Sequence, residues 1–367
     1  MFSNIRGFFS NLYNSKPDVQ ENNLLNNTNK EINEINGIIG EEEMEVPTYS
    51  ETFNQSLNNL MLNNIQTFEN NNINMDVYIK ELNDNGYTVI PNVYNREQID
   101  EYWSEFNKWR ESIQNLDYYH SIIDYHGIFK YFQVGHQRFA WLARTNPKIL
   151  NIFKKIWNTN ELVCSFDGCC YYPTEINEEP RYWIHTDQSP QKKGVWCYQS
   201  FLSLTDNSER TFVLFKGTHK YHEDYFNTMN IDNTSDWNII EESYLDTYHK
   251  DKLEILDVSA GDLVIWDSRL FHQNTCGTPT CDEERLVQYL CYLPKNTLGN
   301  NTFQQNLRNQ YFNELRTTNH WPYPMAPISV QPRTYNHYNP DNEIIIDYDN
   351  IPKPQLDDLL PEIKKLL

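Results

Sequence analysis

Residues 256–272 read LDVSAGDLVIWDSRLFH, and the order of residue types in them indicates a turn, a buried strand and a histidine at its end. The triplet Ala260-Gly261-Asp262 has the residue types of a tight turn, and the apolar run after it has the composition of a buried strand. The run leads to a histidine, His272. From Leu162 onward the chain continues as short apolar runs separated by turn residues, a pattern that is typical of a jelly roll.

A second segment, Trp183-Ile184-His185-Thr186-Asp187-Gln188, carries a histidine and an aspartate two positions apart. In an extended segment such side chains project to the same side, so both can reach one ion. With His272 they make two imidazoles and one carboxylate, the ligand set of non-haem Fe(II) oxygenases. We therefore predict an iron site at His185, Asp187 and His272. The alternatives are a hydrogen-bonded surface pair, a histidine at the edge of the core, and His219 or His222 as the third ligand.

Arg285 opens another strand-like run, residues 285–292. A planar, permanently charged guanidinium at the mouth of a barrel strand suits bidentate binding of a carboxylate. The alternative is an ion pair with Asp282 or Glu284.

The order of these motifs resembles the phytanoyl-CoA dioxygenase family of Fe(II)/2-oxoglutarate oxygenases. The order is His-x-Asp, then a strand ending in Gly217-Thr218-His219-Lys220, then Ala-Gly-Asp before an apolar run and a histidine, then the arginine. Upstream, residues 78–93 are similar to the opening of that family, in which a helix ends at a glycine (here Gly86) and a strand follows. The resemblance covers about residues 78–293 in one continuous order.

The resemblance implies a mainly β fold with flanking helices: a double-stranded β-helix, or cupin-like jelly roll, with N-terminal helical support. It implies Fe(II), 2-oxoglutarate and O₂, with ascorbate as a reductant, and hydroxylation of a small-molecule or acyl substrate with release of succinate and CO₂. Arg285 would hold the distal carboxylate of 2-oxoglutarate. Because Asp187 is retained where related halogenases have a small residue, hydroxylation is favoured. Further cosubstrate contacts are expected at Asn274, Gln199 and Lys130.

Two other functions fit parts of the pattern. The first is a catalytically silent jelly roll that serves as a binding or structural module, against which the retained ligands and Arg285 argue. The second is a cupin-like, metal-dependent lyase or isomerase, which would not need Arg285.

The composition divides the chain into three parts. Residues 1–74 are rich in Asn and Glu without a sustained apolar period, so we predict that they are disordered. Within them, apolar residues near the N-terminus fall on one side of a short helix, so this segment is expected to bind a protein or membrane surface weakly or to be a frayed end. The oxygenase domain is expected over residues 75–335, followed by a C-terminal extension over residues 336–367.

The formal charge of −21 argues against binding to nucleic-acid phosphates. No stretch approaches the length of a transmembrane helix. Seven cysteines, an odd number without an export signal, favour reduced thiols and a cytoplasmic location.

Apolar and aromatic residues at three- and four-residue spacing predict helices over residues 96–116 and 147–157, and a further helix is expected over 307–316. Residues 321–327 contain three prolines and cannot be helical, so they are expected to lie over the surface as an extended arm.

Overall fold

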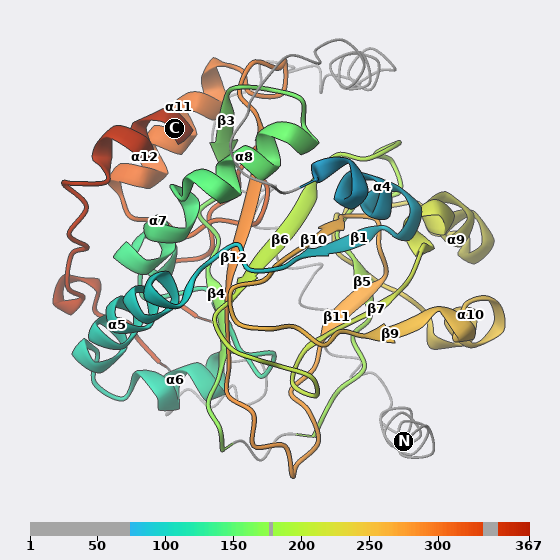
Figure 1. The fold of residues 1–367 in the computed structure, drawn as a ribbon, viewed down its shortest axis with the longest axis horizontal. Helices are drawn as coiled ribbons and strands as arrows, with labels where there is room; N and C mark the ends of the chain where they lie inside the picture. Colours follow the sequence, from blue (N-terminus) through green and yellow to red (C-terminus); the bar gives the residue numbers. More distant parts are fainter. Residues whose placement is uncertain (1–73, 176–178, 333–343) are drawn as a thin grey trace.

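The computed structural model describes residues 74–175, 179–332 and 344–367 (Figure 1). The predicted disorder of residues 1–74 and the N-terminal amphipathic helix therefore fall almost wholly outside the described residues. Among the described residues, no helix combines the length and the apolar composition needed to cross a bilayer.

Two antiparallel sheets form the centre of the domain. The larger sheet has the order β1-β10-β6-β12-β4-β2, with β3 also paired to β12, and the smaller has the order β8-β5-β11-β7-β9. The predicted jelly roll is confirmed. The strands of the larger sheet are β1 (Tyr87–Ile90), β2 (Ile128–Phe129), β3 (Leu162–Cys164), β4 (Cys169–Tyr172), β6 (Tyr198–Ser203), β10 (Leu263–Asp267) and β12 (Arg285–Pro294). Those of the smaller sheet are β5 (His185–Thr186), β7 (Phe212–Phe215), β8 (Asn238–Ile239), β9 (Leu253–Ile255) and β11 (His272–Asn274).

Helices cover the outer face of the larger sheet, and two more lie beside the smaller one (Figure 1). The first group contains α4 (Met75–Asn85), α5 (Arg96–Ser112), α6 (Leu116–Ile123), α7 (Arg138–Arg144), α8 (Pro147–Ile156), α11 (Thr302–Asn313) and α12 (Leu360–Leu366). The second group contains α9 (His222–Met229) and α10 (Glu242–Tyr248). Short 3₁₀ turns are η1 (Val134–His136), η2 (Thr218–Tyr221), η3 (Lys250–Lys252) and η5 (Tyr348–Asn350).

The predicted helices are present with shifted ends. The side chain of Asn95 caps α5 in a reciprocal capping box with Gln98, and Asn146 caps α8, where Pro147 takes the first position. The helix predicted over 96–116 ends earlier, at Ser112, because the chain turns at Asn115, which adopts a positive φ of 59°. The helix predicted over 307–316 runs instead from Thr302 to Asn313.

Side chains along the strands of the larger sheet alternate between two cores. In β10, Leu263 and Ile265 face the helices, whereas Val264 and Trp266 face the space between the sheets. β12 alternates in the same way, so Arg285 projects to the inner side with Val287. The interior between the sheets is thus where the candidate site residues collect.

The predicted turn at Ala260-Gly261-Asp262 is present. Gly261 has a φ of 97°, and a Cβ on it would lie 2.5 Å from the main-chain oxygen of Tyr94, so only glycine fits. The carboxylate of Asp262 accepts the amides of Asn92 and Ser259 at 3.1 and 3.0 Å, which closes the turn before β10.

The expectation of a surface arm over residues 321–327 was wrong. Trp321, Tyr323 and Met325 are buried, with Trp321 packed against Cys197 and Cys291. The hydroxyl of Tyr323 donates to the carbonyl of Pro294 at 2.9 Å. Proline excludes a helix but does not prevent burial of the aromatic residues between the prolines.

Residues 344–367 pack against the same core as the helices around the larger sheet. Their buried apolar side chains belong to that core: Ile346, Ile351, Leu356, Ile363 and Leu366.

We expect deletion of residues 1–74 to leave a folded protein, because the residues lining the cavity described below all lie from Ile128 onward. The melting temperature should change little, and 2-oxoglutarate binding should persist. Thermal melting and calorimetric titration of the truncated protein test this. Aggregation, or loss of the melting transition, would show that the N-terminal segment is needed for folding.

Stability should fall in mild acid. Burial lowers the pKa of His120 to about 4 and the pKa of His136 to about 3. Both rings stay neutral in the folded protein at pH values where the unfolded chain, with histidine pKa values near 6.5, already binds protons. The free energy of unfolding should therefore decrease as the pH falls from about 6.5 toward 4. Urea titrations at pH 7 and pH 5 measure this decrease, and His120→Gln should reduce it; equal stability at both pH values would contradict it.

Candidate metal and cosubstrate site

Three predicted residues converge at one point between the sheets. β5 and β11 are antiparallel neighbours in which His185 lies directly opposite His272. The Nε2 atoms of His185 and His272 lie 3.5 and 3.3 Å from the same carboxylate oxygen of Asp187. All three residues are buried, and they are the only group of this kind among the described His, Cys, Asp and Glu residues.

Main-chain carbonyls orient both imidazoles. The Nδ1 atom of His185 lies 2.8 Å from the oxygen of Trp183, and that of His272 lies 2.9 Å from the oxygen of Leu270. A ring that donates through Nδ1 presents an unprotonated Nε2, the usual arrangement of metal-binding histidines. Two nitrogen lone pairs and a carboxylate oxygen then face one another, an arrangement that can bind a cation.

The carboxylate of Asp187 is buried beside the two imidazoles, and one side-chain donor orients it. The side-chain amide of Gln199 donates to Oδ2 of Asp187 at 2.9 Å. The donor set of two imidazoles and one carboxylate fits Fe(II) with positions left open.

The triad lies in the wall of a cavity of about 250 Å³. Trp183 stacks on His185 and on His126, with ring centroids 4.7 and 3.7 Å apart, which fixes one side of the metal position. The remaining walls combine aromatic rings with polar groups from several loops: Phe201, Phe212, Trp237, Trp266, Tyr289, Asp167, Thr318, Asn319 and His320.

Arg285 is 1% exposed and lines the same cavity. Its Nη1 lies 3.0 Å from the sulfur of Cys170, and its guanidinium lies 5.4 Å from the ring centroid of Phe201. The alternative ion pair with Glu284 is not formed, because that carboxylate accepts the hydroxyl of Tyr171 instead. A buried guanidinium without a carboxylate beside it is costly, so this charge favours an anionic ligand in the cavity.

The other predicted cosubstrate contacts also line the cavity. Asn274 donates from Nδ2 to the carbonyl of His126 at 2.9 Å, and its Oδ1 is buried without a partner among the described residues. Lys130 pairs with the buried carboxylate of Asp124 at 2.8 Å. Gln199, as described, contacts Asp187.

The two rival histidines lie outside the triad. The Nε2 atom of His219 lies 3.0 Å from the carbonyl of Asn83, where it ties the η2 turn to the end of α4. The Nε2 atom of His222 lies 2.8 Å from the carbonyl of Gln188. Neither imidazole lines the cavity.

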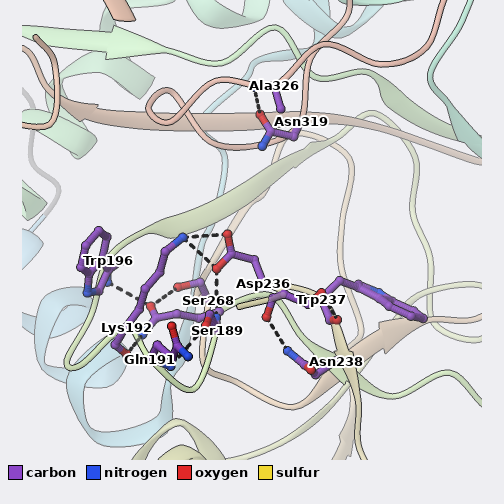
Figure 2. A network of polar contacts seen from close by, with 12 residues as sticks. Ser189, Gln191, Lys192, Trp196, Asp236, Trp237, Asn238, Ser268, Asn319 and Ala326 are labelled. Carbon is purple, nitrogen blue, oxygen red and sulfur yellow. Dashed lines mark hydrogen bonds and ion pairs between the residues drawn. The ribbon is translucent and has the colours of Figure 1, made fainter. Parts of the chain in front are cut away.

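A polar network joins the segment around Lys192 to the segment around Asp236 (Figure 2). The ammonium of Lys192 contacts both carboxylate oxygens of Asp236, at 2.8 and 2.7 Å, and lies 4.1 Å from the ring centroid of Trp321. Asp236 precedes the cavity residue Trp237, and Trp321 follows the cavity residue His320. Lys192 therefore contacts the neighbours of two cavity residues.

Several lining residues were not singled out from the sequence, among them Asp167, Trp237, Tyr289 and His320. Of these, Asp167, Trp237 and His320 lie in loops, where no periodicity indicates direction. Tyr289 could have been found, because it lies four residues after Arg285 in β12 and therefore on the same face.

Two antiparallel sheets with two histidines and one carboxylate converging between them form the ligand arrangement of non-haem Fe(II) oxygenases. No protein-family model matches the chain. It is 29% identical over 189 residues to Ava biosynthesis cluster protein O of Aspergillus versicolor, covering 48% of this chain and 61% of that protein. It is 21% identical over 230 residues to a Dictyostelium discoideum protein named "Putative phytanoyl-CoA dioxygenase", covering 52% and 64%. The second relative confirms the resemblance seen in the motifs. The chain spans less than two thirds of the length of either relative.

Solved structures with a similar fold include GlcNAc Inducible Gene 2 of Candida albicans, with 14% identity, a TM-score of 0.46, and coverage of 62% of this chain and 64% of that one. HygX of Streptomyces hygroscopicus, crystallised with nickel and 2-oxoglutarate, has 14% identity, a TM-score of 0.41, and coverage of 60% and 87%.

Proposed function

We propose that this protein is an Fe(II)- and 2-oxoglutarate-dependent oxygenase that hydroxylates a small molecule. The observation that carries the proposal is the combination, in one cavity, of the converging His185, Asp187 and His272 with the buried guanidinium of Arg285. The name of the Dictyostelium relative supports the reaction class, and the name of the Aspergillus relative supports a substrate from small-molecule biosynthesis.

In this proposal His185, Asp187 and His272 hold the iron. When bound, iron and 2-oxoglutarate supply the oxidising chemistry, in which O₂ and 2-oxoglutarate give succinate, CO₂ and a hydroxylated C–H bond. Arg285 binds the distal carboxylate of 2-oxoglutarate by a bidentate, charge-assisted pair. Gln199 orients the Asp187 carboxylate, and the indoles of Trp183 and Trp266 exclude water from the reacting atoms.

Asn274 and Lys130 are assigned supporting roles at the cosubstrate end. The Oδ1 atom of Asn274 lacks a partner, so rotation of its amide would present a donor to the cosubstrate carboxylate. Lys130 adds positive charge to the same cavity even while it pairs with Asp124. We also propose a reducing, cytoplasmic location with ascorbate as reductant; support for the location comes from the seven cysteines, which are all buried and outside any disulfide.

A silent binding module and a metal-dependent lyase are the competing functions. A silent module has no need of an oriented triad, and a lyase has no need of a buried guanidinium without a carboxylate partner. Both features argue for the oxygenase.

The test is conversion of 2-oxoglutarate labelled with ¹³C by the full-length protein with Fe(II) and ascorbate in air. We expect labelled succinate to accumulate slowly without substrate and faster when a compound from a metabolite library fits the cavity. The same protein without Fe(II) is the control. Absence of succinate with every compound, from protein that retains iron, would contradict the proposed reaction.

A further inference from the structure

The carboxylate of Asp167 is a cavity residue to which the proposed reaction gives no role. It lies in the loop between β3 and β4, and its side chain is 11% exposed. Oδ1 accepts the hydroxyl of Ser165 at 2.8 Å and lies 3.7 Å from a guanidinium nitrogen of Arg144. Among the described residues, no other side chain donates to this carboxylate. A nearly buried carboxylate is stabilised by each hydrogen bond that it accepts. A ligand in the cavity can supply a further donor to Asp167.

Asp167 and Arg285 line one cavity and carry opposite charges. Asp167 precedes Gly168, whose carbonyl accepts the amide of Tyr289 at 3.3 Å, and Arg285 lies four residues before Tyr289 at the start of β12. An anionic cosubstrate is attracted by Arg285 and repelled by the carboxylate of Asp167. This carboxylate is therefore available to a second molecule.

His320 lines the same cavity as Asp167 and Asp187. Burial raises the pKa of Asp167, and Arg144, Ser165 and His320 act against that rise. The Nε2 atom of His320 is buried without a hydrogen-bond partner among the described residues.

The cations around the cavity are already paired or assigned. Of the lysines and arginines that line it, Lys130 pairs with Asp124, and Arg285 is assigned to the cosubstrate. Lys192 pairs with Asp236. The adjacent Lys193 pairs with Glu223 at 3.4 Å. An anionic substrate, such as a coenzyme A thioester with its phosphates, would therefore meet no uncommitted lysine or arginine in the described lining.

We propose that Asp167 binds the substrate by accepting a hydrogen bond from an ammonium or hydroxyl group of a small, non-anionic molecule. This inference rests on the proposed oxygenase function. The cavity of about 250 Å³ must hold the cosubstrate as well, so the substrate is small. Trp237, which follows Asp236 of the Lys192 network (Figure 2), lines the cavity and offers an aromatic face to its carbon skeleton.

The experiment uses the full-length protein with Fe(II) and 2-oxoglutarate and a panel of compounds in matched sets. Each set shares one carbon skeleton and contains the primary amine, the alcohol, the carboxylic acid and the acyl-coenzyme A thioester. Binding is measured under argon as a shift in melting temperature, and turnover in air as succinate above the compound-free rate. We expect amines or alcohols to respond in both measurements, and acids and thioesters in neither.

Two variants separate the two donor groups. Asp167→Asn keeps an acceptor oxygen but loses the charge, so it should weaken an ammonium ligand by more than about tenfold and an alcohol by only about threefold. Asp167→Ala should weaken both by more than about tenfold. Ser165→Ala, the matched control, leaves the carboxylate in place and should keep the response. Arg110→Ala is the control for compound-free conversion of 2-oxoglutarate, which should stay within about twofold of wild type, since Arg110 pairs with Asp117 on the surface and does not line the cavity.

The proposal is overturned if only acids or thioesters respond in the wild-type protein, if no donor-bearing compound responds, or if Asp167→Ala binds the responding compound as well as wild type does. The comparison of the compound classes with the wild-type protein tests the proposal even if a variant fails to fold. Failure of the oxygenase function itself would look different: compound-free succinate would be absent, while the melting shifts would still report binding at Asp167.

Discussion

Replacing Arg285 with alanine is expected to weaken the binding of 2-oxoglutarate by about 2–4 kcal/mol, or roughly 30- to 1,000-fold, while iron still binds. The reason is that the guanidinium is 1% exposed and lines the cavity with no carboxylate partner in the described part of the chain, so the cosubstrate supplies its counter-charge. Anaerobic calorimetric titration of the Fe(II)-loaded protein measures the affinity.

The affinity of the Arg285→Lys variant for 2-oxoglutarate should lie between those of wild type and Arg285→Ala, because an ammonium keeps the charge but cannot form the bidentate pair. Arg110→Ala is the matched control, since that arginine pairs with Asp117 on the surface and does not line the cavity. If Arg285→Ala binds 2-oxoglutarate as tightly as wild type, the carboxylate is held elsewhere, with Lys130 the first candidate.

Removing one triad ligand should strongly weaken the binding of Fe(II). His185→Ala or Asp187→Ala is expected to lower Fe(II) affinity by more than about 100-fold, because loss of outer-shell partners alone costs roughly 10- to 100-fold. Gln199→Ala should show that smaller effect, since its amide holds the Asp187 carboxylate without lying in the triad. Iron retained after anaerobic equilibrium dialysis is the measurement.

His219→Asn is the control for the triad variants, because His219 contacts the carbonyl of Asn83 and not the metal position. It should retain iron as wild type does. Full iron retention by both His185→Ala and Asp187→Ala would contradict the ligand assignment.

Much of the jelly roll could be predicted because burial in its strands follows the two-residue period. In the sequence, residues 263–266 form an apolar run after a turn, which predicts a strand that is buried on both faces. The two-residue period of a strand then places Leu263 and Ile265 in one core and Val264 and Trp266 in the other. The same period places His185 and Asp187 on one side of a strand and Arg285 on the inner face of β12. The direct opposition of His185 and His272 was beyond the sequence, because register between distant strands depends on tertiary pairing.

The substrate end of the cavity was harder to foresee. Asp167, Trp237 and His320 come from three separate loops, and loop residues carry no period that shows which side chains point inward. The burial of Trp321 was missed for a related reason: the neighbouring proline excludes a helix, but packing against Cys197 and Cys291 is a tertiary property.

The most direct test of an iron and 2-oxoglutarate centre at this site is visible absorption of the full-length protein under argon. A weak charge-transfer band, giving a lilac tint, should develop when both Fe(II) and 2-oxoglutarate are present and not with either alone. It should be absent in His185→Ala, and in Arg285→Ala it should need far more 2-oxoglutarate to develop. No band in wild-type protein that holds both ligands, or a band of equal strength in His185→Ala, would contradict the account.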